Sequence, residues 1–364
     1  MERHASYPML FSMIALSVMF FNCEGPEGPA GTDGTDGTDG IAGVDANETC
    51  KVCHNDGGML TGIQAQYAVS GHATGGTANY GNQEGECSEC HTSQGFVYYQ
   101  ANGVSSPTHF ASVSQPDCRA CHMIHTEYDS TDWAFRVTDP VVSFRDATQT
   151  FADFGTANLC VACHQTRSSA LPALDATADV SVDTKRFGPH HAPQGNFMDN
   201  SAGQQFTGVA YTPSVHTVVA DGCVTCHMAD GGHYPYGGHT FSMTASFHGP
   251  QFNDTACDVV GCHAGADVKA LITATKADIA PLLTELKAAL GDYLDTSGYL
   301  AERTIVGTDT TYTSPTEDDP IDFDPVVLGA VYNYRMIAFE DPGYAVHNPK
   351  LARALLQNSI DALP

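Results

Sequence analysis

The chain has 364 residues and a formal net charge of −27, from 42 acidic and 15 basic side chains. This balance argues against nucleic acid and anionic lipid headgroups as partners, because both are bound by clustered Lys and Arg. It would attract a basic partner protein, or serve only to keep an exported protein soluble, and composition does not separate these alternatives.

Residues 1–22 are predicted to be a signal peptide. Met9–Phe21 is an apolar run of 13 residues, which is short for a membrane-spanning helix and fits a signal-peptide core. Cys23 follows directly, as in a bacterial lipoprotein that is cleaved before this cysteine and lipidated on it. Residues 20–22 depart from the usual cleavage pattern, so cleavage elsewhere and an uncleaved anchor remain alternatives. We expect an exported protein, either an outer-membrane lipoprotein at the cell surface or an extracellular one.

Residues 23–47 are predicted to form a tether. Glycine occupies every third position from Gly25 to Gly43, the Gly-x-y pattern of collagen. The run is short and contains few prolines, so a flexible acidic tether is favoured over a triple helix.

The 13 cysteines follow a recurring pattern. Five segments read Cys-x-x-Cys-His, and a sixth has four residues between its cysteines. In such a motif two thiols can bond covalently to one haem, and the following histidine binds its iron. Zinc ribbons are the rival interpretation, but they do not need a histidine after every second cysteine. The sequence therefore predicts six covalently bound c-type haems.

The predicted attachment residues are Cys50, Cys53, Cys87, Cys90, Cys118, Cys121, Cys160, Cys163, Cys223, Cys226, Cys257 and Cys262. The predicted proximal iron ligands are His54, His91, His122, His164, His227 and His263. Six motifs use 12 of the 13 cysteines, and Cys23 is the remaining one, so no disulfide is expected.

The chain has 17 histidines, enough to give every iron a second imidazole ligand. Methionine is the competing distal ligand and would raise the reduction potential. However, Met123 and Met228 directly follow proximal histidines and cannot easily reach the opposite face of the same iron. We therefore predict bis-histidine ligation and low potentials.

Several further segments carry a resemblance to a known family. They are Ser70-Gly71-His72-Ala73, Asn158-Leu159-Cys160 with Gly188-Pro189-His190, Gly238-His239-Thr240-Phe241, and His347-Asn348-Pro349. From Cys50 onward the chain resembles bacterial outer-surface six-haem c-type cytochromes, which are similar to extracellular electron-transfer and filament-forming cytochromes. The last two segments are also similar to motifs of multihaem nitrite-reductase and hydroxylamine-oxidoreductase relatives.

The resemblance implies the distal ligands. It points to His72, His190, His239 and His347, with His216 as a fifth. The sixth is His125 or His109. We prefer His125, which lies three residues after His122 and could serve a neighbouring haem.

The expected fold is that of a multihaem cytochrome c: loop-rich, with mainly short α-helices and little β-structure around a haem-packed core. Residues 48–264 would form that core, and residues 265–364 a C-terminal helical region that supplies a distal histidine. Helical patterns cover 266–295, 324–339 and 349–363, with Pro281 as a kink or helix start and Asn348 as an N-cap. The segment 308–324 reads as an acidic loop with carboxylates of the kind that bind calcium. Residues 129–153 read as a loop or small β-hairpin.

These features favour a function in electron transfer through a chain of six haems, outside the cytoplasm. The expected partners are redox proteins or an extracellular acceptor, and the resemblance adds assembly into a homopolymer. We expect an electron carrier rather than an enzyme. The alternative is a multihaem oxidoreductase that acts on a small nitrogen or sulfur compound at one open haem.

Overall fold

The computed structural model describes residues 50–364 with internal gaps, and these residues belong to one compact unit, Asp45–Pro364. The gaps are 52–53, 55–57, 83–86, 145, 168–170, 172, 174–177, 233–234, 247–248, 260, 342 and 344–345. The predicted signal peptide, the lipid site at Cys23 and the Gly-x-y tether lie outside the described residues. Within the described residues, no helix has the length and apolar character needed to cross a bilayer.

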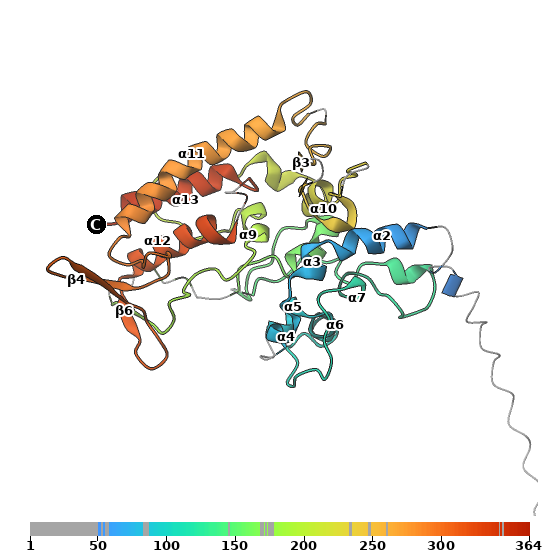
Figure 1. Ribbon diagram of the computed structural model, residues 1–364, viewed down its shortest axis with the longest axis horizontal. Helices are drawn as coiled ribbons and strands as arrows, with labels where there is room; N and C mark the ends of the chain where they lie inside the picture. The colour runs from blue at the N-terminus through green and yellow to red at the C-terminus, as the bar shows by residue number, and fades with distance from the viewer. Residues whose placement is uncertain are drawn as a thin grey trace, which may run out of the picture. The chain divides into compact units, whose positions relative to one another are not determined.

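The motif-bearing part consists of short helices joined by long loops (Figure 1). The α-helices are α2 (Met59–Ala68), α3 (Gly71–Thr74), α4 (Ala78–Gly81), α5 (Ser88–His91), α6 (Ser93–Asn102), α7 (Cys118–Cys121), α8 (Asn158–Val161), α9 (Gln194–Met198) and α10 (Gly222–His227). The 3-10 helices are η2 (Ser130–Trp133), η3 (Gly155–Ala157), η4 (Val215–Val218) and η5 (Gly238–Thr240). Side-chain caps start several of them, because Ser70, Thr92 and Asp117 each accept a hydrogen bond from an otherwise unpaired amide of the first turn.

Three small antiparallel sheets complete the described secondary structure. They pair β1 (Val180–Val182) with β6 (Ile321–Phe323), β2 (Thr244–Ser246) with β3 (Pro250–Phe252), and β4 (Glu302–Val306) with β5 (Asp309–Thr313). The prediction of a loop over 308–324 is therefore wrong at both ends, where β5 and β6 lie. Threonine and tyrosine favour strands, and Gly307 turns the β4–β5 ribbon with φ 66°.

The three helices predicted in the C-terminal region are confirmed, with shorter bounds. They are α11 (Val268–Ala289), α12 (Pro325–Arg335), which continues as the π-helix η6 (Met336–Glu340), and α13 (Pro349–Ala362). Asn348 is the N-cap of α13, as predicted, and its side chain accepts from the Leu351 amide at 3.2 Å. Pro281 lies inside α11 and does not end it.

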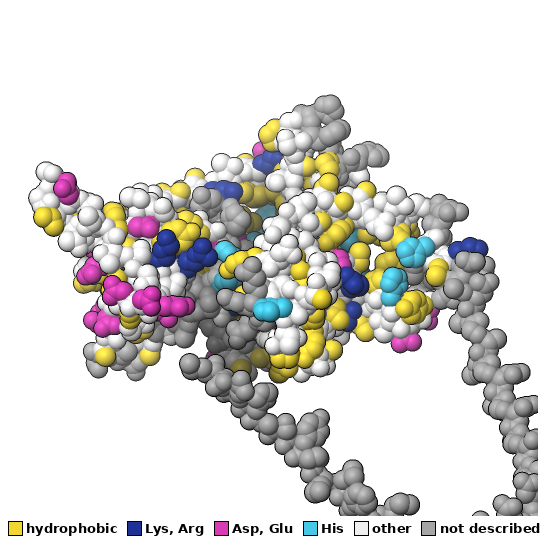
Figure 2. Space-filling view, turned by 60° about the horizontal axis from the view of Figure 1, so that its bottom comes forward, with side chains coloured by type: hydrophobic (Ala, Val, Ile, Leu, Met, Phe, Trp, Pro, Cys, Tyr) yellow, Lys and Arg dark blue, Asp and Glu magenta, His cyan; other side chains and the backbone are white. Residues whose placement is uncertain are grey.

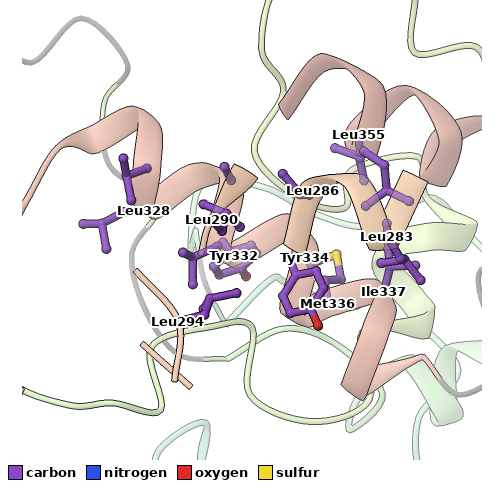
Figure 3. Packing of buried hydrophobic residues seen from close by; sticks show 14 of the residues in the cluster. Leu283, Leu286, Leu290, Leu294, Leu328, Tyr332, Tyr334, Met336, Ile337 and Leu355 are labelled. Carbon is purple, nitrogen blue, oxygen red and sulfur yellow. The ribbon is translucent and has the colours of Figure 1, made fainter. Parts of the chain in front are cut away.

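The largest hydrophobic core lies among α11, α12 and α13, where leucines of α11 face Tyr332 of α12 and Leu355 of α13 (Figure 3). Val182, Phe197 and Phe206 from the preceding region also belong to it, so the core spans the predicted boundary at residue 264. By contrast, the motif-bearing part contributes two separate clusters of only five and four buried residues. Apolar side chains alone thus form little core around the motifs.

Candidate functional site

The Cys-x-x-Cys-His motifs fold into single turns that end at the histidine. The amide of the motif histidine donates to the carbonyl of the first cysteine, at 2.7 Å in the first motif, 2.8 Å in the third and 2.9 Å in the fourth. Helices α5 and α10 carry the histidines of the second and fifth motifs. Residues three and four positions apart lie on one side of a helical turn, so such a turn can present two cysteines and the histidine together, as attachment to one flat ring requires.

The sixth motif closes in the same way although it is two residues longer. Its His263 amide donates to the Cys257 carbonyl at 3.1 Å, and the Cys262 amide donates to the Val259 carbonyl at 3.0 Å. Gly261, with φ 91°, accommodates the extra residues in a conformation that a side chain would oppose. The sixth motif therefore shares the hydrogen bond from the histidine amide to the first-cysteine carbonyl with the first, third and fourth motifs.

Each motif histidine lies opposite one of the predicted distal histidines. Numbered by motif, the six sites pair His54 with His125, His91 with His190, His122 with His239, His164 with His72, His227 with His347, and His263 with His216. In the same order the ring centroids are 6.4, 6.4, 6.4, 6.0, 6.3 and 6.3 Å apart.

This spacing fits one metal ion between two imidazoles. Two metal–nitrogen bonds of about 2 Å, with each nitrogen about 1.1 Å from its ring centre, give a separation of roughly 6.2 Å. Directly packed imidazole rings would come closer, as His190 and the neighbouring His191 do at 4.7 Å. Among the described residues, no three His, Cys, Asp or Glu side chains converge on one metal position. Two axial imidazoles per iron suffice for a haem, because the macrocycle supplies the remaining ligands.

Hydrogen bonds at Nδ1 leave the other ring nitrogen, Nε2, free for a metal. Backbone carbonyls lie next to Nδ1 of His122 (Trp133, 2.7 Å), His227 (Phe241, 2.9 Å) and His216 (Val346, 2.8 Å). A ligating histidine typically donates its second N–H in this way, which fixes its tautomer and orientation.

The fifth site differs because its distal ring contacts a carboxylate. Nδ1 of His347 lies 3.2 Å from Oδ1 of Asp341, which is fully buried. Burial is the largest single influence and acts to lower the pKa of His347. The hydrogen bond to Asp341, the negative charge of Asp341 and that of Cys223 together outweigh burial, so the pKa is raised. Elsewhere burial lowers the pKa of His72 and takes the pKa of His164 to about 4, which keeps these rings neutral as iron ligands must be.

The loop that presents His125 is held by one buried carboxylate. Asp132 accepts from the amides of His125 and Glu127, at 2.7 and 2.8 Å. His125 has φ 62° and His190 has φ 64°, a region that non-glycine residues rarely occupy. Such strained residues concentrate at functional positions, where the surrounding structure enforces them.

The remaining predicted residues are placed as follows. His109, the alternative sixth ligand, is exposed, and its Nδ1 contacts the Asn82 carbonyl instead of another ring. Cys53 lies outside the described residues. All eleven described cysteines are free of disulfides, and Cys50, Cys118 and Cys262 are exposed.

Three contributors were missed by sequence reasoning. Phe241 contacts His72 and His239 with its ring, at centroid distances of 5.0 and 5.8 Å. Arg167 contacts Glu89 and the Cys90 sulfur of the second motif, and Asp341 contacts the predicted ligand His347. Phe241 adjoins a predicted ligand in sequence and could have been suspected for that reason, whereas no local pattern marks the other two.

No family model, curated protein or solved structure matches the chain.

Proposed function

We propose that this protein carries electrons through six c-type haems, each attached to two cysteines and held between two histidines. The observation that carries the proposal is the pairing of all six motif histidines with a second imidazole at 6.0–6.4 Å. Cysteine attachment motifs predict the haems, and the pairs supply both axial positions of each iron.

A bound haem supplies one-electron iron chemistry, and the chain's residues set its position and potential. Two imidazoles on each iron give low-spin centres that change little in geometry on reduction. Carbonyl and carboxylate groups at Nδ1 hold the rings in place and increase their basicity, which favours the oxidised iron and lowers its potential.

The pairing also bears on the alternative, catalysis at an open haem. That chemistry needs an iron with one axial position free for substrate. Within the described residues every motif histidine has a second histidine opposite it, and no side chain arrangement favours a substrate-binding iron. We therefore propose a carrier rather than an oxidoreductase.

The proposed haems also lead to proposals for the location and the partners of the protein. Haem attachment to such motifs occurs outside the bacterial cytoplasm, so we propose export, with lipid anchoring at Cys23. Redox proteins or an extracellular acceptor would exchange electrons with the haems, and assembly into a homopolymer stays a prediction.

Carboxylates gather on one face, over the side that carries β4 and β6 (Figure 2). Exposed acidic residues there include Glu317, Asp318, Asp319, Asp322 and Asp324. They suit a basic partner, whose association rate should then fall steeply as ionic strength rises.

Haem content tests the proposal. Protein produced with a c-type haem attachment system should contain six haems per chain by pyridine haemochrome, and intact mass should agree. A Cys257→Ala, Cys262→Ala variant should contain five. Colourless protein from a host that loads other c-type cytochromes would contradict the proposal.

A further inference from the structure

The fourth motif, Cys160–His164, is in contact with three other motifs. Its first contact is with the second motif. Arg167, three residues beyond His164, forms an ion pair with Glu89 of the second motif at 3.1 Å, and both side chains are largely buried. The same arginine lies 3.6 Å from the Cys90 sulfur.

The second contact is with the fifth motif. Val161 of the fourth motif packs in one apolar cluster with Cys223 and Val224 of the fifth. Just before the two motifs, Asp221 accepts from the amide and hydroxyl of Thr156 at 2.8 and 2.7 Å. Backbone and side chains thus fasten these two motifs together.

The third contact is with the third motif. Ala120 of that motif is buried in one cluster with Ala162 and partly buried Cys163 of the fourth. Phe241 links the distal ligands of the same two sites, since its ring contacts both His72 and His239.

The first and sixth sites are each linked to one of the neighbours of the fourth motif. His125 of the first site and His122 of the third are presented by one short loop. The sixth site meets the fifth where His216 hydrogen-bonds to the carbonyl of Val346, the residue before His347.

We propose that the six sites form a branched network with the fourth site as its junction, so that electrons can move between three ends of the network. This inference rests on the proposed function. The ends are the first, second and sixth sites. Each end has an exposed ligand or attachment residue: His54 and His125 at the first site, His190 at the second and Cys262 at the sixth. By contrast, His72 and His164 of the junction are not exposed. A carrier with three exits can accept electrons at one surface and deliver them to two acceptors, or connect two neighbouring copies and one acceptor.

The arrangement of irons in the haem-loaded protein tests this directly. In an experimental structure the fourth iron should have three near neighbours, those of the second, third and fifth sites. A single file in which the fourth iron has two neighbours would overturn the branched network while leaving six-haem electron transfer intact. Absence of haem would instead overturn the proposed function.

A second test uses redox interaction between neighbouring haems. His72→Met should raise the potential at the fourth site, because methionine ligation favours reduced iron. In redox titrations followed by NMR, the haem signals of the second, third and fifth sites should then shift in midpoint more than those of the first and sixth. The matched variant His125→Met, at an end, should shift mainly the third. If His72→Met shifts the midpoint potentials of only two other sites, the fourth site is not a junction. If that variant loses its haem, the iron–iron neighbours in the experimental structure provide the test instead.

Discussion

Ring orientation divides the six histidine pairs into two classes. In the first, third and fifth sites the ring planes meet at 28°, 33° and 10°, whereas in the second, fourth and sixth they meet at 79°, 82° and 78°. When the two imidazole planes are near parallel, the iron d orbitals with which they interact differ in energy. When the planes are near perpendicular, these orbitals stay close in energy. We expect the oxidised protein to give two equal populations in its paramagnetic resonance spectrum, rhombic low-spin signals and highly anisotropic ones. A single class of signal would contradict these ring orientations.

The choice between His125 and His109 has a direct test. His125→Ala should leave one of six ferric haems five-coordinate or water-bound, because it removes the ring opposite His54. Its absorption spectrum should gain a high-spin component of about one sixth, whereas His109→Ala, which changes an exposed ring, should not. The reverse outcome would assign the ligand to His109.

Asp341 should tune one haem. Asp341→Asn removes the negative charge beside Nδ1 of His347, which makes the ring a weaker donor and favours reduced iron. We expect the potential of the fifth site to rise by roughly 30–60 mV, since a tenfold change in a one-electron equilibrium is about 59 mV. Glu340→Gln is the matched control, because Glu340 pairs with His191, which lies opposite no motif histidine. Equal shifts in both variants would indicate a general charge effect instead.

Local sequence specifies only half of each site. A cysteine spacing and the adjacent histidine define the attachment turn, so those residues could be proposed from the sequence alone. The distal partner is set by tertiary structure: His72 precedes the second motif yet lies opposite His164 of the fourth. His125 lies three residues from His122 but faces His54, because a left-handed backbone turns it away.

At the scale of the secondary-structure elements, the N-terminus of α13 contributes most to the position of the predicted ligands. Fully buried Asn348 accepts from the amides of Leu351 and Ser214 at 3.2 Å, and its amide donates to the carbonyl of Phe197 at 3.0 Å. It therefore fixes both the turn that carries His347 and the segment leading to His216.

Asn348→Ala should lower the free energy of unfolding by roughly 2–4 kcal/mol, because an N-cap and further buried hydrogen bonds are lost together. Chemical denaturation of the loaded protein, followed by helical circular dichroism, measures this. Asn102→Ala, which removes an exposed hydrogen bond at the end of α6, is the control and should change stability by less than about 0.5 kcal/mol. Comparable losses would show that Asn348 does not organise this region.

Helices of the C-terminal region could be predicted because their apolar periodicity and caps are local signals, as at Asp267 and Asn348. The β4–β5 ribbon also has local signals, namely β-branched residues on both sides of a glycine turn and a tyrosine after it. The acidic composition of the segment obscured them. Pairing of β1 with β6 could not be predicted, since Val180 meets Phe323 only through the packing of the whole C-terminal region.

At the scale of the whole molecule, the proposed haems would account for both the sparse side-chain core around the motifs and the six histidine pairs. Six flat apolar cofactors would fill the space among the short helices, and burial of their surfaces would supply the hydrophobic stabilisation that the side chains there do not. Folding of the motif-bearing part should then depend on haem attachment, whereas the largest side-chain core, which lies mainly among the C-terminal helices, should depend on it less.

Near-infrared magnetic circular dichroism of the fully oxidised protein tests the central claim most directly, because its charge-transfer bands identify both axial ligands of ferric haem. We expect bands of bis-histidine, low-spin iron alone, with an intensity that corresponds to six haems per chain. Bands of histidine–methionine or high-spin iron, or an intensity far below six haems, would contradict this account.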